Sequence, residues 1–403
     1  MLQKLSLKKI SAFITGVIAA LCVFVSVSHA GEKKAAFDPK SVVFVTNRDS
    51  SDVTIIDMNT DTVIDRIACG DWGNPHMSVP TDDGQYLVST CSQGNYVAVI
   101  NLKTREVSRV RLDVMPEHFC VSADNELAYI GNMGGGSVSV LDIKAKKEIT
   151  NIPGFFEPHG LVCSADGSKV YIANMGAHEV GVIDTKTLQL VKRIEIGSAD
   201  MLAMVNRIDM NNKLSEVVGS ANPTLTLDGK YAYVADGDSN QVAVINTAND
   251  EIIATIPVGD EPWRAYASPD GTKMVVPNNG DHTISVIDVK TNKVIATFRG
   301  DEDMTGVNFL HNGKKAYVIS RGDSALRVIN LEKMKEVKRI KLPEGSSLET
   351  ASTTPDGKKV YLAASRRNSV YVFDGTTDRY KEIPNVGYSP WAVSIIGGAN
   401  YCH

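Results

Sequence analysis

One pattern of residues occurs eight times in this chain, and this repetition constrains the possible folds more than any other feature. Each unit has a segment of aromatic, aliphatic, small and Asn residues, such as FVTN at 44–47 and YIGN at 129–132. A second segment of alternating character follows and ends in Asp or Asn, as at 284–288. Equivalent units start at residues 44, 87, 129, 171, 233, 275, 317 and 361, so they lie 42–44 residues apart except for one gap of 62. A period of this length is typical of repeat architectures.

Each unit has room for four short strands separated by turns that contain Gly, Asp and Asn. A single sheet cannot bury both of its faces, whereas sheets packed side by side around an axis can. The sequence therefore predicts an all-β fold, a closed β-propeller of eight four-stranded blades. Seven blades is the alternative. The repeats begin with a second strand at residue 41 and end with a first strand at 390–396, so we expect the C-terminal strand to complete the first blade.

Residues 1–30 have the pattern of a secretory signal peptide. Lys4, Lys8 and Lys9 precede an apolar run at 10–27, and a small-x-small site precedes Gly31. An uncleaved anchor is the alternative. We therefore expect an exported protein, periplasmic or otherwise extracytoplasmic, with no membrane span after cleavage. The domains predicted are a signal peptide at 1–30, an N-terminal extension at 31–40, the propeller at 41–397 and a free tail at 398–403.

The charge balance argues against a nucleic-acid partner. The chain has 42 Lys and Arg residues against 47 Asp and Glu, with a formal net charge of −5. Proteins that bind nucleic acids usually show a basic excess or a basic stripe.

The long gap between units contains an insertion of about twenty residues, 198–220. Apolar residues recur there at helical spacing, which predicts an amphipathic helix beside one end of the channel. Methionine side chains suit an adaptable contact surface. The insertion therefore predicts an interaction surface that includes Met201, Met204 and Met210; the alternative is that the helix folds down onto its own blade.

One position in each unit begins the first strand, close to the axis. Alignment of the units on their Asp-Gly turns gives the ring Trp391, His76, Glu117, His159, Ala221, Trp263, Thr305 and Glu349. Proline precedes this position in five units. His118 is one residue out of register, so we expect it to point to the other face of its strand.

Three consecutive units thus bring His76, Glu117 and His159 to the mouth of the channel. Imidazoles and carboxylates in such a set can bind a divalent metal, and the predicted metal ligands are His76, Glu117, His159 and Glu349. The same groups can act as acid and base, or His76 and His159 can ligate a haem-type iron. Trp391, Trp263 and Thr305 would line the rest of the mouth. The alternative is that these side chains only pack against the next blade.

Five cysteines follow the predicted signal peptide: Cys69, Cys91, Cys120, Cys163 and Cys402. An odd number leaves at least one thiol without an internal partner. Cys69 and Cys91 share a strand face and form the favoured pair. Cys120 and Cys163 differ by one in register, so we expect them on opposite faces.

The repeated segments resemble the YVTN-type β-propeller repeat family, whose naming motif is close to residues 44–47. The resemblance covers residues 41–397 and implies the fold. The eight-unit count is similar to that of the d-haem domain of cytochrome cd nitrite reductase and its periplasmic relatives. The chain is also similar in type to the haem-free propeller subunit of hydrazine synthase.

These resemblances imply three functions. The first is a non-catalytic accessory subunit or scaffold of a periplasmic haem redox complex of nitrogen metabolism, with multihaem cytochromes as partners and no cofactor of its own. The second is a tetrapyrrole-binding protein for d-type haem, with His76 or His159 as the iron ligand. The third is a metal-dependent lactonase or hydrolase. The sequence contains no complete catalytic motif, so we expect no catalysis by this chain alone.

Overall fold

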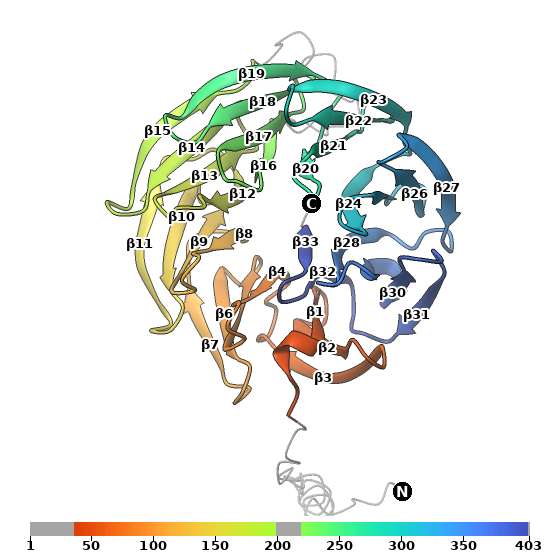
Figure 1. Cartoon of the computed structure of the whole chain (residues 1–403). Helices are drawn as coiled ribbons and strands as arrows, with labels where there is room; N and C mark the ends of the chain where they lie inside the picture. Colours follow the sequence, from red (N-terminus) through yellow and green to blue (C-terminus); the bar gives the residue numbers. More distant parts are fainter. Residues whose placement is uncertain (1–35, 199–218, 402–403) are drawn as a thin grey trace, which may run out of the picture. The chain divides into compact units, whose positions relative to one another are not determined.

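Eight sheets surround a central axis in this computed structural model, which describes residues 36–198 and 219–401 (Figure 1). The prediction of eight blades is confirmed, and the alternative of seven is wrong. The predicted signal peptide, Cys402 and almost all of the predicted insertion, with Met201, Met204 and Met210, lie outside the described residues. Within the described part, no helix has the length and apolar character of a membrane span.

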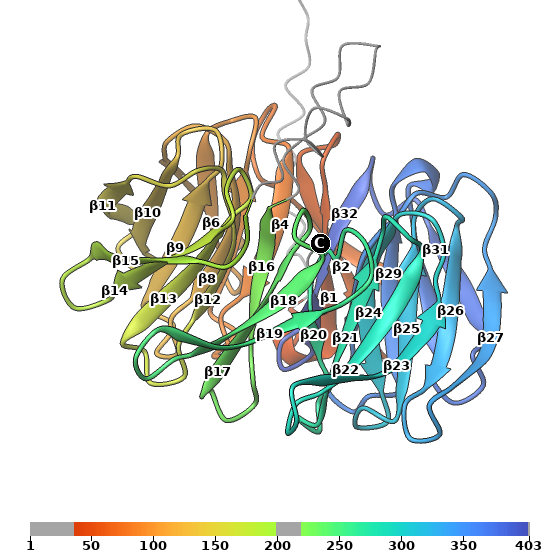
Figure 2. The same ribbon diagram turned by 90° about the horizontal axis from the view of Figure 1, so that it is seen from above.

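The blades are numbered here along the chain, and their strands run from the axis outward (Figures 1 and 2). Blade 1 contains β32 (Pro390–Ser394), β1 (Val42–Asn47), β2 (Asp52–Asp57) and β3 (Thr62–Ala68). Blade 2 contains β4 (Pro75–Pro80), β5 (Tyr86–Cys91), β6 (Tyr96–Asn101) and β7 (Val107–Arg111). Blade 3 contains β8 (Pro116–Val121), β9 (Leu127–Asn132), β10 (Ser137–Asp142) and β11 (Lys147–Pro153). Blade 4 contains β12 (Pro158–Cys163), β13 (Lys169–Asn174), β14 (Glu179–Asp184) and β15 (Gln189–Glu195).

The second half of the ring follows the same plan. Blade 5 contains β16 (Ser220–Leu225), β17 (Tyr231–Asp236), β18 (Gln241–Asn246) and β19 (Glu251–Pro257). Blade 6 contains β20 (Tyr266–Ala267), β21 (Lys273–Asn278), β22 (Thr283–Asp288) and β23 (Lys293–Arg299). Blade 7 contains β24 (Met304–Leu310), β25 (Lys315–Ser320), β26 (Ala325–Asn330) and β27 (Lys335–Lys341). Blade 8 contains β28 (Leu348–Thr353), β29 (Lys359–Ala364), β30 (Ser369–Asp374) and β31 (Tyr380–Pro384). Two 3₁₀ turns, η1 (Pro39–Ser41) and η2 (Ser365–Arg367), complete the described elements.

The two ends of the repeat region meet in blade 1. Strand β32 pairs antiparallel with β1, with Ser394 opposite Phe44 and Val393 opposite Val45. The C-terminal strand therefore completes the first blade, as predicted. Backbone hydrogen bonds across this pair close the ring.

The burial of each strand follows from its distance to the axis. All six residues of β1 are buried, because blades on both sides cover the second strand. Exposure alternates along the outermost strand β3, since one of its faces meets solvent. The core is accordingly made of eight apolar clusters, and several of them span two adjacent blades; one joins Phe44 and Ile55 of blade 1 to Leu87 and Ile100 of blade 2.

The polar residues that recur at strand ends satisfy the backbone at turns. The Asp57 carboxylate accepts hydrogen bonds from the backbone N–H groups of Asn59 (2.9 Å) and Thr60 (2.8 Å). Asn132 is fully buried, and its Nδ2 donates to the hydroxyls of Ser137 and Ser139 at 3.0 and 2.8 Å. The Asn and Asp of the repeat are therefore required by turn chemistry.

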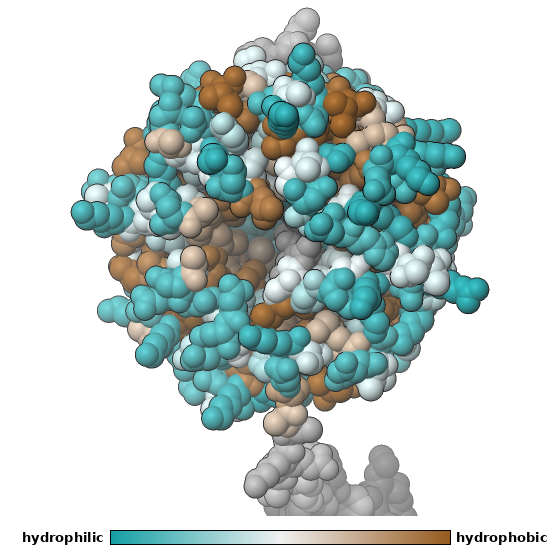
Figure 3. All heavy atoms as spheres, viewed as in Figure 1, coloured by the Kyte–Doolittle hydropathy of each residue, from teal (hydrophilic) through white to brown (hydrophobic). Residues whose placement is uncertain are grey.

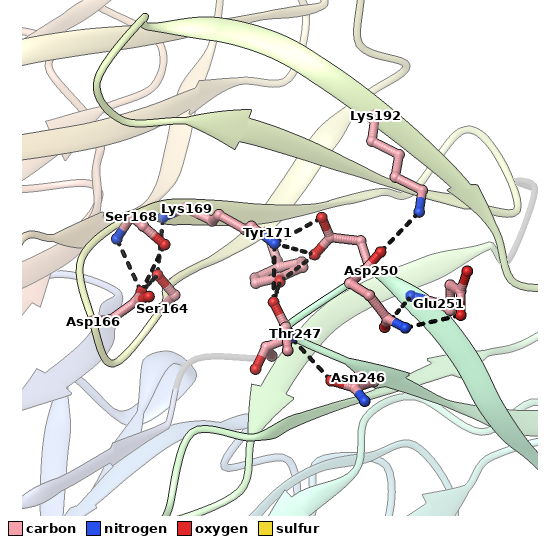
Figure 4. A network of polar contacts seen from close by, with 12 residues as sticks. Ser164, Asp166, Ser168, Lys169, Tyr171, Lys192, Asn246, Thr247, Asp250 and Glu251 are labelled. Atoms are coloured by element: carbon pink, nitrogen blue, oxygen red, sulfur yellow. Dashed lines mark hydrogen bonds and ion pairs between the residues drawn. The ribbon is translucent and has the colours of Figure 1, made fainter.

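Three of the eight interfaces between blades carry the same polar clamp. In Figure 4, Lys169 and Tyr171 of blade 4 reach Asp250 in an outer turn of blade 5. The Lys169 ammonium lies 2.8 Å from the Asp250 carboxylate, and the Tyr171 hydroxyl donates to it at 2.6 Å. Blades 7 and 8 repeat the clamp through Lys315, Tyr317 and Asp378, and blades 8 and 1 through Lys359, Tyr361 and Asp61. The last of these clamps ties the end of the ring to its beginning.

The tail departs from expectation. Residues 399–401 do not form a free tail but a strand, β33 (Ala399–Tyr401), which pairs with β28 inside the ring (Figure 1). Ala399 lies opposite Thr353 and Tyr401 opposite Ala351, so β33 lines the part of the channel that is remote from the start of β28. The inner edge of β28 offers unpaired backbone groups, and the tail satisfies them. The space-filling view, taken from the same side as Figure 1, shows a hollow at the centre of the ring (Figure 3).

Removal of the Asp61 charge is expected to weaken ring closure. Burial by itself raises the pKa of Asp61, but hydrogen bonds from Lys381, Tyr361 and Lys359 outweigh it and lower the pKa. Asp61→Asn keeps the side-chain shape and the positive φ of 53°. We expect it to lower the free energy of unfolding in urea at pH 7 by about 1–2 kcal/mol, as for a hydrogen-bonded charge.

The control is Glu332→Gln, which removes an exposed ion pair with Lys314 and should change stability by less than about 0.5 kcal/mol. A carboxyl whose pKa is lowered by folding stabilises the protein above its unfolded pKa of about 3.9, and this contribution is lost as the pH falls further. The difference between wild type and Asp61→Asn should therefore shrink below about pH 4. Equal stability of the two proteins at pH 7 would contradict the clamp.

Candidate functional site

The inner strands share a β-bulge just after their first residue. In β4, Pro75 lies opposite Cys91 but Ser78 lies opposite Ser89, so three steps on one strand match two on the other. The register of β8, β12, β16, β28 and β32 shifts at the same place. A bulge breaks the alternation of side chains along a strand. Two consecutive residues of each inner strand can therefore face the channel side.

This bulge overturns the expectation for His118. The structure does not turn His118 away but places its ring between those of His159 and His76, with centroid distances of 3.9 and 5.2 Å. Indoles continue the series at both ends, since Trp391 lies 5.8 Å from His76 and Trp263 lies 6.1 Å from His159. We call Trp391, His76, His118, His159 and Trp263 the imidazole–indole arc. The predicted ring positions are indeed the second residues of their inner strands, or follow the Pro262 bridge in blade 6.

A carboxylate and a guanidinium accompany the arc on blades 1 to 3. Glu117 Oε1 lies 3.7 Å from His76 Nδ1, and both side chains are buried. Burial raises the pKa of Glu117 to about 6, against the opposing charge of Arg48. The Arg48 guanidinium lies 4.3 Å above the Trp391 ring, and its Nε donates to Asn74 at 2.9 Å. A buried carboxyl with a pKa of about 6 makes this part of the mouth sensitive to pH, and the Arg48 guanidinium over Trp391 adds a fixed positive charge.

His159 has a defined tautomer. Its Nδ1 lies 3.0 Å from the carbonyl oxygen of Ala221. A carbonyl only accepts, so Nδ1 carries the proton and Nε2 carries the lone pair. Burial lowers the pKa of His159 to about 4, and the nearby Arg264 adds to this effect. A neutral imidazole whose second nitrogen donates to a carbonyl is the usual state of a metal-ligating histidine.

The four residues predicted as metal ligands are not gathered into one group. The Glu349 carboxylate accepts hydrogen bonds from Ser365 (2.6 Å), Ser347 (2.8 Å) and Arg321 (3.3 Å). The Thr305 hydroxyl donates a hydrogen bond to the carbonyl oxygen of Leu348 at 3.4 Å. Among residues 36–198 and 219–401, no three His, Cys, Asp or Glu side chains are placed to hold a metal ion. A divalent metal at His76, Glu117, His159 and Glu349 stays a prediction.

Three mouth residues were missed by sequence reasoning: His118, Arg48 and Arg264. Each directly follows a residue of the repeat pattern: His118 follows Glu117, Arg48 follows Asn47 and Arg264 follows Trp263. The feature that would have found His118 is the bulge in β8, which brings the residue after the ring position to the channel side. Arg264 donates to the Thr224 hydroxyl at 3.2 Å on the neighbouring blade.

The four cysteines within residues 36–198 and 219–401 are free thiols, and they form two pairs. Cys69 and Cys91 lie in one buried cluster, as their shared face predicts. A hydrogen bond with the Cys91 thiol and burial raise the pKa of Cys69. The expectation that Cys120 and Cys163 face apart is wrong, because both pack in one cluster, and burial and the Cys163 thiol raise the pKa of Cys120. Both strands have the same bulge before the cysteine, so the two thiols do lie on opposite faces of their own sheets. Adjacent blades pack opposite faces against each other, however, and this brings Cys120 of blade 3 and Cys163 of blade 4 into the same interface.

We expect the His159 imidazole to stay neutral over most of the accessible pH range. Its ¹⁵N resonances should show a protonated Nδ1 and an unprotonated Nε2 at pH 7, with a midpoint near pH 4. An unfolded histidine binds its proton near pH 6.5, so the folded state should lose stability as the pH falls between about 6.5 and about 4. His159→Asn identifies the resonances. A midpoint near 6.5, or a protonated Nε2, would contradict the assignment.

The fold and the mouth define the class of protein: an eight-bladed β-propeller with an imidazole–indole arc at one end of its channel. No protein-family model matches the chain, and no curated protein matches its sequence. One similar solved structure is dihydro-heme d1 dehydrogenase NirN in complex with DHE, with a TM-score of 0.71 and 17% identity over 89% of this chain and 76% of that chain. Another is hydrazine synthase from Kuenenia stuttgartiensis, with a TM-score of 0.55 and 22% identity over 77% of this chain and 97% of that chain. At these identities the likeness shows a shared propeller fold, and the YVTN-type resemblance stays a prediction.

Proposed function

We propose that this protein binds a planar, anionic tetrapyrrole of the d-type haem class at the channel mouth. The observation that carries the proposal is the imidazole–indole arc, in which His159 presents Nε2 with its lone pair. Indole faces stack on flat aromatic ligands, and guanidinium groups bind carboxylates.

The residues present fit such a ligand. His159 would offer Nε2 to the metal of the tetrapyrrole, and His76 or His118 would contact the ligand beside it. Arg48 and Arg264 would bind its carboxylates, and Trp391 and Trp263 would cover its edges. The bound metal would supply ligand exchange and redox chemistry, whereas the protein holds the ring, fixes the histidine tautomer and sets the charge around it.

The comparison with NirN supports the proposal, since that propeller was solved in complex with DHE and aligns with 89% of this chain. A role in handling or processing a tetrapyrrole is favoured over reduction of a substrate by this chain alone. We also propose export, as the N-terminal pattern predicts, and a periplasmic location.

A second candidate function is that of an accessory subunit or scaffold beside haem proteins. It is supported by the likeness to a hydrazine synthase chain, 97% of which is covered. The two functions are compatible, because a tetrapyrrole-binding chain can serve a haem complex. No observation favours the lactonase or hydrolase prediction over these two.

Titration with a tetrapyrrole tests the first function. Iron protoporphyrin added to the protein should give a shifted Soret band and quench the fluorescence of Trp263 and Trp391. His159→Asn keeps a donor toward the Ala221 carbonyl but lacks a metal-binding imidazole, so we expect at least about tenfold weaker binding, or about 1.4 kcal/mol.

The matched control is His282→Ala, which removes an exposed histidine from the β21–β22 loop. It should bind the tetrapyrrole as the wild type does. Equal binding by wild type and His159→Asn, with circular dichroism showing both folded, would overturn the proposal.

Binding should also strengthen as Glu117 becomes neutral. Above its pKa of about 6 the Glu117 carboxylate repels an anionic ligand, and below that pH the carboxyl can donate a hydrogen bond to it. We expect affinity for the anionic tetrapyrrole to rise about three- to tenfold from pH 7.5 to pH 5.5, equivalent to about 1 kcal/mol. Fluorescence titration measures it.

Glu117→Gln should flatten most of this pH dependence, whereas the exposed Glu332→Gln should leave it unchanged. An unchanged pH profile in Glu117→Gln would show that this carboxyl does not face the ligand.

A further inference from the structure

The loops at the mouth end of the ring expose large apolar side chains on four consecutive connections. These loops join the last strand of one blade to the first strand of the next, and they end where the inner strands begin. Their exposed fractions are 65% for Tyr388, 85% for Trp72, 50% for Val114, 40% for Met115 and 56% for Phe156. We call these five residues the apolar arc. It extends from the blade 8–blade 1 connection to the blade 3–blade 4 connection.

Hydrogen bonds to neighbouring loops hold these four connections; in the Trp72 connection the Cys69 N–H donates to the Ser51 carbonyl at 2.9 Å. The Tyr388 N–H donates to the Ser50 hydroxyl at 3.0 Å, and the Met115 carbonyl accepts from the Met133 N–H at 2.9 Å. The Phe156 carbonyl accepts from the Gly176 N–H at 3.2 Å. The apolar side chains are therefore presented to solvent on fixed backbone rather than on loose ends.

Trp72 is the least expected member of the arc. It is the most exposed large apolar residue in the described ranges, and its φ is +57°. A bulky residue with positive φ costs energy, and an indole in water gains nothing from folding. Fold stability therefore does not account for tryptophan at this position, whereas a contact with another molecule does. Tryptophan and tyrosine are the residues that most often anchor protein interfaces.

The other side of the same end carries carboxylates instead. Five successive connections of blades 5 to 8 expose one acidic residue each: Asp260, Asp281, Glu302, Asp323 and Glu344. We call these residues the acidic arc. Asp71 and Glu157 add exposed carboxylates beside Trp72 and Phe156, and Arg366 and Arg367 stand between the acidic arc and Tyr388.

We propose that the mouth end is a docking surface for a protein that presents an apolar patch ringed by lysines, the chemistry of a basic monohaem cytochrome. The apolar arc would take the patch, with Trp72 at its centre, and the acidic arc would take the lysines. This inference rests on the proposed association with haem proteins, and it names the surface and the partner.

The negative charge of this surface argues against two other occupants, a second copy of this chain and an anionic membrane. A second copy would bring acidic loops against acidic loops, because a symmetric dimer uses the same patch twice. An anionic lipid surface would be repelled by the acidic arc and by Asp71 and Glu157, the carboxylates beside the apolar arc. A basic protein is the occupant that satisfies the apolar and the charged halves together.

Calorimetric titration of the full protein with a basic monohaem cytochrome c tests the proposal. We expect micromolar affinity at low salt that weakens with added salt, and a loss of about tenfold or more in Trp72→Ser and in Tyr388→Ser. Asp260→Lys combined with Glu302→Lys should weaken binding about three- to tenfold. The matched control is Leu227→Ser, a residue 75% exposed in the turn after β16 at the opposite end of the ring, and it should bind as the wild type does.

Several results would overturn the docking surface. They are absence of cytochrome binding, equal binding by Trp72→Ser and Leu227→Ser, Trp72-dependent binding to anionic vesicles in place of the cytochrome, and a dimer that Trp72→Ser dissociates. His159→Asn separates this inference from the tetrapyrrole site. It should lose tetrapyrrole binding but keep the affinity for the cytochrome, so either proposal can fail without the other.

Discussion

Ring closure is the constraint on which the rest of the structure depends. The second and third strands of the blades are buried on both faces, so a blade that lost one neighbour would expose a full sheet face. Closure rests on the pairing of β32 with β1 and on the contact of Lys359 and Tyr361 with Asp61. A closed ring brings eight strand starts to one small opening. Every functional group discussed above is there because that opening exists.

The architecture was predictable because the repeat is regular and its chemistry is local. The turn residues of each unit, such as Asp57 and Asn132, act on backbone a few positions away, so their meaning can be read without the rest of the fold. The ring positions were predictable for the same reason, since a fixed spacing before the Asp-Gly turn reaches the second residue of the inner strand in seven blades and the residue after the Pro262 bridge in blade 6.

The details of the mouth were not predictable, because they depend on a bulge that leaves no distinct mark in a single unit. Strict alternation places His118 on the wrong face. For Cys120 and Cys163 it gives opposite faces correctly, but opposite faces of adjacent blades pack together, so the two thiols meet. Glu349 shows a second limit. Its position in the ring is correct, but Arg321, Ser347 and Ser365 bind its carboxylate, and these partners come from loops that the repeat does not fix. The tail strand β33 shows a third, because its partner is an inner edge that only the closed ring creates.

The two proposed sites occupy the same sector of the ring. The three imidazoles belong to blades 2, 3 and 4, and the apolar arc lies on the connections from blade 8 to blade 4. Arg48, which stacks on Trp391, directly follows β1 and lies in the loop whose Ser50 hydroxyl accepts the Tyr388 N–H hydrogen bond. A ligand held by His159 would therefore lie beneath a protein seated on Trp72. The buried His159 imidazole needs a dry environment to keep its low pKa, and a docked partner would keep water out of the mouth. The sector with exposed carboxylates then has a separate task, since charge acts at longer range than apolar contact and orients the partner before it reaches the apolar arc.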